Sequence, residues 1–341
     1  MIRRILYEIL VAYVRLGLKV YFSRITIHGT EHIPRNGPLL FTANHQNSFL
    51  DAILIAAAQP RRLHFLVRAD VFRKPLASKI LRALSMMPVY RFRDGWQSLG
   101  KNAESFEEVA SLFKRNEAVL IFPEGNHSLL RRLRPLSRGF TKPLALAIEK
   151  NPQQKIMVVP TGLNFSSHMS FRSGVSVYFG RPVDVSTFLQ EGELDANALR
   201  EKVSEEMKKL IVHIEDLNNY PVIESCLALE GFDFLDPQIT NARILQASES
   251  NRDNFSGSPV KNKMISATIF RSLHFPVLAG WNRVQAKITD PVFTASLKFV
   301  YGIFAFPLYY LSIFVVVNLM AGMQTAILTL IVFAGSIFFK R

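Results

Sequence analysis

The sequence predicts a layered α/β domain that is held at a membrane by segments near both ends of the chain. Three observations lead to this prediction. Apolar strands alternate with helical stretches between residues 24 and 217, residues 1–22 have an amphipathic pattern, and a 41-residue run near the carboxy terminus carries no charged residue. Strands that alternate with helices are typical of a mostly buried sheet with helices packed on its faces.

The amino-terminal residues 1–22 predict an amphipathic helix that lies on a membrane surface. Charged residues fall on one face of this helix, and apolar residues at helical spacing fall on the other. The apolar set is Ile2, Ile5, Leu6, Ile9, Tyr13 and Leu16, and the charged set is Arg4, Glu8, Arg15 and Lys19. A secretory signal does not normally hold charges such as Glu8 and Arg15 within its apolar stretch. The alternative is a helix that packs on the protein's own core.

Residues 23–217 predict the main domain, whose elements follow one another as short apolar strands and longer amphipathic stretches. The expected strands are Arg24–His28, Leu39–Ala43, Leu63–Val67, Met87–Phe92, Ala118–Phe122, Ile156–Pro160 and Val175–Phe179. The expected helices are Ser48–Ala58, Pro75–Leu84, Gly95–Arg115, Lys142–Glu149 and Asn197–Leu217, with Ser48 as the cap of the first.

Residues 218–295 form an extension for which the sequence suggests no role. Within it, the run 247–263 is rich in Ser and Asn and predicts a flexible polar loop.

Residues 296–341 predict a helical hairpin in the membrane. The uncharged run Phe299–Phe339 would be about 60 Å long as one helix, twice the roughly 30 Å hydrocarbon core. A break near Gly322 divides it into two spans, which places Lys298 and the final Lys340-Arg341 on one side. The positive-inside rule makes that side, and the main domain with it, cytoplasmic. A re-entrant hairpin that does not fully cross is the alternative, because the second span is short.

Composition narrows the partners of this chain. Hydrophobic residues make up 49% of the sequence and the formal net charge is +14, which suits either nucleic acid or anionic lipid. The uncharged carboxy-terminal run favours lipid over nucleic acid. The single Cys226 excludes an internal disulfide framework and a cysteine-based zinc cluster.

The first motif with chemical potential is the segment from Asn44 to Asp51, which follows a strand and precedes a helix. Open α/β sheets place their ligand sites at such strand ends. A neutral imidazole at His45 can take a proton from an attacking hydroxyl, and Asp51 can orient it. The alternative is that Asp51 stabilises the start of the helix and His45 is an ordinary loop residue.

The second motif, Phe122-Pro123-Glu124-Gly125, ends another apolar strand. Gly125 permits either a positive φ angle or a close backbone approach to a ligand. A cluster of cations follows, made of Arg131, Arg132, Arg134, Arg138 and Lys142, and such a cluster suits phosphate unless it is simply a solvated face. Arg91, at the end of the strand that begins near Met87, is a further phosphate candidate. A serine hydrolase is disfavoured because the sequence has no Gly-x-Ser-x-Gly elbow.

Taken in this order, these segments resemble the glycerophospholipid acyltransferase family. The resemblance covers about Ile25 to Val185 and includes the His45/Asp51, Pro88–Arg91, Phe122–Gly125 and Val158–Pro160 blocks. It implies a mixed sheet flanked by helices, and it implies that His45 is the general base and that Asp51 orients it. It also implies that Arg91, Glu124 and Gly125 bind the acceptor.

The chain departs from the common family pattern in two places. Five residues separate His45 from Asp51, where four are usual, and a similar spacing occurs in a subgroup of fungal glycerol-3-phosphate/dihydroxyacetone-phosphate acyltransferases. The pair can therefore meet only if a loop at Gln46–Ser48 absorbs the extra residue. Asn126-His127-Ser128 stands where Thr-Arg-Ser is common, so Arg131, Arg132 or Arg138 is expected to replace the missing phosphate-binding arginine.

The resemblance implies direct transfer of a fatty acyl group from acyl-CoA or an acyl-carrier-protein thioester, with no bound cofactor and no metal. Lysophosphatidic acid is the expected acceptor. Glycerol-3-phosphate, dihydroxyacetone phosphate, another lysolipid or an aminolipid are the alternatives. The expected partners are membrane lipids, the glycerophospholipid acceptor and acyl-carrier protein as one of the two donors, with no nucleic acid. A catalytically silent lipid-binding protein of the same fold is the alternative class, which applies if His45 and Asp51 do not meet.

Overall fold

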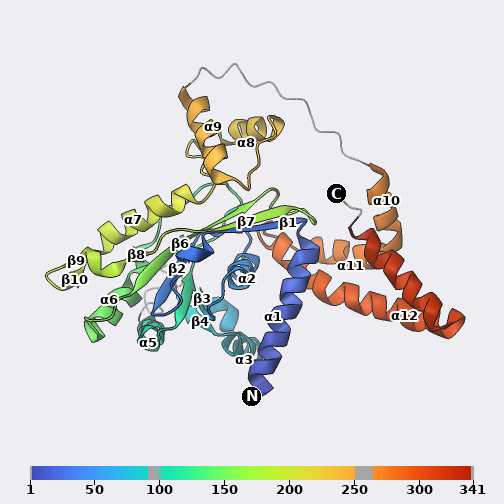
Figure 1. Ribbon diagram of the computed structural model, residues 1–341, viewed down its shortest axis with the longest axis horizontal. Coiled ribbons are helices and arrows are strands. Elements are labelled where there is room, and N and C mark those ends of the chain that lie inside the picture. The colour runs from blue at the N-terminus through green and yellow to red at the C-terminus, as the bar shows by residue number, and fades with distance from the viewer. Residues whose placement is uncertain (1, 91–99, 101, 250–263, 339–341) are drawn as a thin grey trace.

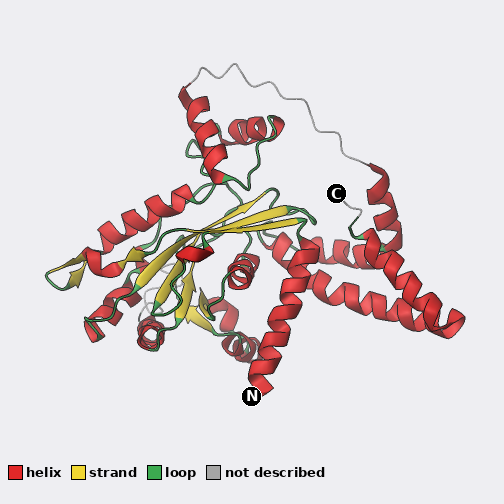
Figure 2. Ribbon diagram, viewed as in Figure 1, coloured by secondary structure: helices red, strands yellow, loops and turns green. Residues whose placement is uncertain are grey.

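A computed structural model of the protein describes residues 2–90, 100, 102–249 and 264–338, and a central sheet with helices on both faces forms its main body (Figures 1 and 2). The strands are β1 Arg24–His28, β2 Leu39–Ala43, β3 Leu63–Arg68, β4 Met86–Val89, β5 Ala118–Ile121, β6 Met157–Phe165, β7 Gly174–Phe179 and β8 Val183–Asp184. Within the described residues, the order across the sheet is β1-β7-β6-β2-β5-β3-β4, with β8 beside β6.

The sheet is mixed, as expected. Strands β2, β3, β4 and β5 run parallel to their neighbours, and β6 is parallel to β2 but antiparallel to β7 and β8. Strand β6 continues to Phe165, five residues beyond the predicted Pro160, because residues 161–165 pair with β7. A small ribbon of β9 Leu189–Gln190 and β10 Glu193–Leu194 lies apart from this sheet.

The helices of the main domain are α2 Phe49–Ala58, α3 Pro75–Ala83, α5 Asn102–Lys114, α6 Lys142–Lys150 and α7 Ala196–Lys209. The predicted helix 95–115 begins within residues 91–99 and 101, which lie outside the described residues. The predicted Asn197–Leu217 ends early, at Lys209, and residues 211–214 instead pack in the core or bond to its loops.

Each face of the sheet has its own core, because side chains alternate along a strand. In β2, Leu40 faces one cluster, which α5, α6 and α7 supply with Phe113, Leu144 and Val203. The neighbouring Leu39 and Phe41 face a second cluster, to which α1, α2 and α12 contribute. The terminal helices are therefore part of the core on one face of the sheet.

Helix α1 (Ile2–Tyr21) packs on the protein's own core at its carboxyl end. Its last turn is anchored in the second core, where Leu18, Tyr21 and the following Phe22 are buried. Earlier in the helix, Ile9 and Leu16 remain 60% exposed. The contact of these exposed apolar residues with a membrane surface stays a prediction.

The extension is helical, with α8 Tyr220–Leu229, α9 Pro237–Glu249, α10 Met264–Leu273 and α11 Phe275–Gln285. The predicted polar loop 247–263 overlaps the end of α9, and residues 250–263 lie outside the described residues. The division of the chain into residues 1–22, 23–217, 218–295 and 296–341 stays a prediction.

The carboxy-terminal run forms α12 (Phe293–Ser336), which is interrupted at Gly322. Gly322 has φ 81° and ψ 166°, a conformation that only glycine adopts easily. The rings of Tyr309 and Phe333 lie 6.3 Å apart across this break, whereas 24 residues of straight helix would span about 36 Å. The chain therefore folds back at Gly322, as Figure 1 shows for the orange and red segments of α12.

Gly162 in β6 lies so close to the backbone of Leu210 that there is no space for a side chain. A Cβ atom at Gly162 would lie 2.2 Å from the backbone oxygen of Leu210, so we expect Gly162→Ala to destabilise the protein by about 1 to 3 kcal/mol. Gly335→Ala is the control, since a Cβ there meets no described atom within 4 Å. Equal thermal unfolding temperatures for both variants would contradict this packing.

Candidate active site

The site is built around the loop between β2 and α2. The buried Asn44 side chain fastens the start of this loop to β6: its Nδ2 donates to the Leu163 carbonyl (2.9 Å), and its Oδ1 accepts from the Leu163 amide (2.8 Å). His45 follows directly, at the carboxyl end of a strand in the centre of the sheet. This is the position where open α/β sheets place ligand sites.

His45 and Asp51 meet. His45 Nδ1 donates to Asp51 Oδ2 at 2.9 Å, and the same oxygen accepts the backbone N–H groups of Gln46 and Asn47, each at 2.8 Å. Asp51 is fully buried, so its carboxylate depends on these three donors in place of water. With Nδ1 as the donor, a neutral His45 has its lone pair on Nε2, the arrangement that a general base requires.

The loop absorbs the extra residue at Ser48, as its position predicts. Ser48 has φ 52° and ψ −136°, and α2 begins directly after it at Phe49. The prediction that Ser48 caps this helix is wrong, because within the described residues its side chain makes no capping hydrogen bond. The backbone angles of Ser48 turn the chain sharply, and a cap would need an extended residue there.

Phe122 and His127 confine the imidazole of His45. The ring of Phe122 stacks on His45, with centroids 3.9 Å apart and planes 14° from parallel. His127 approaches edge-on at 5.7 Å. Stacking on an apolar ring holds the plane of the imidazole, and the hydrogen bond to Asp51 holds its rotation.

Gly125 has φ 70°, so the turn itself requires glycine. A Cβ there would meet no described atom within 4 Å, and the space beside it is open.

Glu124 links the two motifs. Its Oε2 accepts from the backbone of His45 at 3.3 Å and from the Arg134 guanidinium at 2.9 Å, and its Oε1 accepts the Arg134 backbone N–H at 3.0 Å. Burial raises the pKa of this carboxyl, and the pairing with Arg134 opposes the rise. The sequence offered no cation adjacent to Glu124, because its partner lies ten residues further along a loop.

The other cations of that loop differ in their surroundings. Arg131 is buried, pairs with Glu224 at 2.9 Å and stacks on Phe234 at 3.9 Å. Arg138 is exposed in the short helix Arg138–Phe140, and Arg132 is half-buried. Arg131 is thus held by contacts with the extension, and phosphate binding by Arg131, Arg132 or Arg138 stays a prediction. Arg91 lies outside the described residues.

A second imidazole, that of His127, lies beside His45, and the sequence did not predict its role there. His127 Nε2 lies 3.1 Å from Asp290 Oδ2, which belongs to the turn between α11 and α12. Burial lowers the pKa of His127, with His45 and Arg68 acting in the same direction and Asp290 opposing them. Only the departure of Asn126-His127-Ser128 from the common pattern could have drawn attention to this residue.

Among the residues that the structure describes, no group of three His, Cys, Asp or Glu side chains is placed to hold a metal ion.

Comparison with known proteins now identifies the class. Residues 24–164 match the family model described as acyltransferase. Among curated relatives, the glycerol-3-phosphate O-acyltransferase 2 of Saccharomyces cerevisiae is 32% identical over 109 residues, which are 32% of this chain and 14% of that protein. A 1-acyl-sn-glycerol-3-phosphate acyltransferase of Cocos nucifera is 27% identical over 175 residues, which are 51% of this chain and 52% of that protein.

The chain spans about half the length of the plant relatives and much less of the yeast ones. Among solved structures, the 1-acyl-sn-glycerophosphate acyltransferase PlsC of Thermotoga maritima has 19% sequence identity and a TM-score of 0.46, with 61% of this chain and 79% of that chain covered.

His213 accepts a hydrogen bond from the loop that carries Arg134, and this contact predicts that the stability of the protein depends on pH. The Leu133 backbone N–H donates to His213 Nδ1 at 2.9 Å, so His213 must be neutral there. Burial, with Lys208 nearby, lowers the pKa of His213 to about 4 from the usual value near 6.5. Between these values the unfolded chain binds more protons, so the stabilisation is complete above pH 6.5 and is lost as the pH falls towards 4.

We therefore expect the thermal unfolding temperature of the wild type to fall more steeply between pH 6.5 and 5 than that of His213→Asn, whose Oδ1 accepts the same bond without titrating. The difference should stay below the roughly 1.4 kcal/mol per pH unit of a fully shielded group, because solvent screens this one in part. Parallel pH profiles would contradict the prediction.

Proposed function

We propose that this protein is a membrane-bound acyltransferase that moves a fatty acyl group from a thioester to the hydroxyl of lysophosphatidic acid. The 2.9 Å contact between His45 Nδ1 and Asp51 Oδ2 carries the proposal, because it supplies an oriented base despite the unusual spacing. The matching acyltransferase family and the printed names of the relatives support the same reaction class.

In the proposed reaction, His45 Nε2 takes the proton of the acceptor hydroxyl as its oxygen attacks the thioester carbonyl. The tetrahedral intermediate then collapses, the C–S bond breaks, and the departing thiolate takes the proton from the imidazolium. Asp51 stabilises that imidazolium and keeps the ring in place. No covalent enzyme intermediate is needed, because a thioester is already activated. Acyl-CoA and an acyl-carrier-protein thioester both fit this scheme.

A large apolar cavity supports a lipid acceptor. It has a volume of about 1020 Å³ and lies between α1, the 169–171 loop, α10, α11 and α12. On α12 its lining includes Phe299, Gly302, Ile303 and Phe306, which begin about one helical turn beyond the residues that contact the His45 loop. A chain-bearing acceptor gains from such a cavity, whereas glycerol-3-phosphate has no apolar part to place in it.

The proposed attachment to the membrane uses α12. Residues Phe293–Ala321 of α12 have the length and composition of a membrane span, and the most apolar 18-residue stretch within them is not buried inside the protein. The second part, Met323–Ser336, has 14 residues, about 21 Å of helix against a hydrocarbon core of roughly 30 Å. These lengths favour a re-entrant hairpin over two full crossings. We place the main domain on the cytoplasmic face, on the basis of Lys298 at the start of the span.

The alternative of a catalytically silent lipid-binding protein depends on His45 and Asp51 failing to meet. Their hydrogen bond removes the observation that would have favoured it. Glycerol-3-phosphate remains the second candidate acceptor because the yeast relatives carry that name.

His45→Ala is expected to abolish thiol release from acyl-CoA with every acceptor, because the base is removed, while the protein stays folded in the membrane. The measurement is thiol release by purified protein with lysophosphatidic acid, glycerol-3-phosphate and other lysolipids in parallel, each also with an acyl-carrier-protein donor. His28→Ala, at an exposed histidine of β1, is the matched control. Full activity of His45→Ala would disprove the proposed mechanism.

Gly302→Leu should reduce activity by filling the cavity. The reduction should be larger for a long-chain lysophosphatidic acid than for a short-chain one, since one buried methylene contributes about 0.8 kcal/mol. Gly335→Leu places the same side chain elsewhere on α12, outside the cavity lining, and should have little effect. A loss that does not depend on the acceptor's chain length would argue against an acceptor chain in this cavity.

A further inference from the structure

The amino-terminal end of α12 reaches the His45 site from nearly 250 residues further along the chain. Three of its residues make the contact: Asp290 in the preceding turn, Phe293 at the first helical position and Ser296 one turn later. Phe293 and Ser296 are three residues apart and share one face of the helix. The ring of Phe293 lies 4.9 Å from that of His127, so the same face meets both loops of the site.

Ser296 bridges the loop that holds the extra residue. Its hydroxyl is fully buried, donates to the Asn47 carbonyl and accepts the Leu50 backbone N–H at 3.1 Å. These two groups stand on either side of Ser48, whose backbone has a positive φ angle. One side chain therefore clamps both sides of the turn, and that turn brings the Gln46 and Asn47 amides onto the Asp51 carboxylate.

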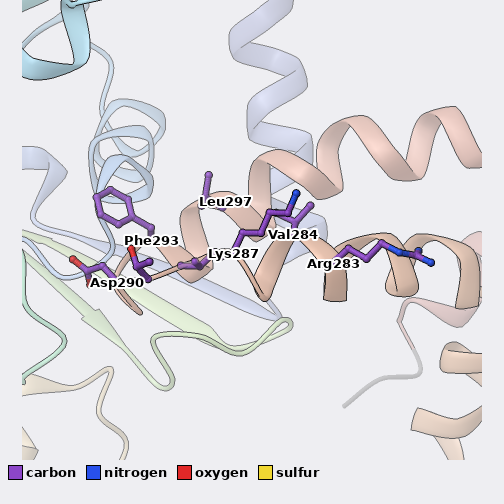
Figure 3. Close-up of a pocket in the computed structure, with 8 residues that line it drawn as sticks. Arg283, Val284, Lys287, Asp290, Phe293 and Leu297 are labelled. Carbon is purple, nitrogen blue, oxygen red and sulfur yellow. The ribbon is translucent and has the colours of Figure 1, made fainter.

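Asp290 reaches the second imidazole. It accepts a hydrogen bond from His127 Nε2 at 3.1 Å, and the Val292 backbone N–H holds its other oxygen at 3.1 Å. Figure 3 shows Asp290 and Phe293 together at one end of a pocket of about 370 Å³, which continues past Lys287 and Arg283. The turn before α12 thus forms a wall of that pocket and also fixes the orientation of His127.

We infer that the start of α12 is a working part of the active site, in which Ser296 positions the His45–Asp51 loop and Asp290 positions His127. The inference rests on the proposed acyl transfer at His45. Packing of α12 on the core would need only its apolar residues, such as Ala295 and Phe299, which belong to the second core cluster. Ser296 and Asp290 instead bind polar groups of the two loops that surround the imidazole. It follows that residues 24–164, which match the acyltransferase family model, do not complete this site without the start of α12.

Ser296→Ala in the full-length protein tests the first half of the inference. The turnover number for thiol release should fall roughly ten- to hundredfold, the range for a catalytic group displaced by about 1 Å, with little change in the KM for the thioester. Ser296→Thr keeps the hydroxyl and should recover much of the activity. Ser312→Ala is the control, because that hydroxyl binds only the Tyr309 carbonyl of its own helix among the contacts described.

Hydrogen exchange of the segment 47–50 supplies a readout that does not depend on activity. Exchange of the Leu50 amide should be faster in Ser296→Ala than in the wild type or in Ser312→Ala, because the variant loses one of its two acceptors and keeps only the Asn47 carbonyl at 3.2 Å. Wild-type exchange together with wild-type turnover would overturn the role of Ser296. If exchange is faster in Ser296→Ala but the wild-type protein releases no thiol with any acceptor, the role of Ser296 as a clamp is supported and the proposed function is contradicted.

A double-mutant cycle tests Asp290. If this residue acts through His127, Asp290→Asn and His127→Gln should each lower the turnover number, and the double variant should be no worse than His127→Gln alone. Losses that multiply in the double variant would show that Asp290 acts by another route, as would wild-type activity of Asp290→Asn. Ser312→Ala again serves as the control variant on α12, because the Ser312 hydroxyl binds the Tyr309 carbonyl of the same helix.

Discussion

The structure depends on the three hydrogen bonds that meet at one oxygen of Asp51. A carboxylate without solvent contact is costly, and here the His45 ring and the amides of Gln46 and Asn47 replace water. The donors can converge only because Ser48 reverses the chain between them and α2. The fastening of Asn44 to β6 and the clamp by Ser296 hold the two ends of that reversal. The base of the proposed reaction is thus oriented by tertiary contacts, and the local helix alone could not orient it.

The sheet explains how these contacts come together. Strands β2 and β5 are parallel neighbours, so their carboxyl ends bring His45 beside Phe122 and Glu124. Glu124 then connects the His45 backbone to Arg134, and the loop that carries Arg134 is held by His213. On the other side, α12 approaches from the face that also holds α1 and α2. The site lies where the core of the main domain meets the apolar helix α12, which suits the proposed lipid acceptor.

Much of this arrangement could be predicted from sequence, because periodicity and motif order are local properties. The strands β1 and β2 match their predicted bounds, and the loop at Gln46–Ser48 absorbs the extra residue as its length requires. The pairs Glu124–Arg134 and His127–Asp290 could not be predicted, since each depends on which loops the fold places together. For the same reason the sequence suggested that Arg131 binds phosphate, whereas in the structure Arg131 forms an ion pair with Glu224 of α8. Of the cations that follow the second motif, Arg134 pairs with Glu124 of that motif and Arg131 pairs with Glu224 of the extension, and their places in the sequence do not distinguish them.

The clamp by Ser296 couples two distant segments mechanically. Its hydroxyl bonds to the chain on both sides of Ser48, so a shift of the start of α12 along the core would pull on the loop that carries His45. The position of α12 and the orientation of the imidazole are therefore a single variable, and a ligand that moves one of them also moves the other.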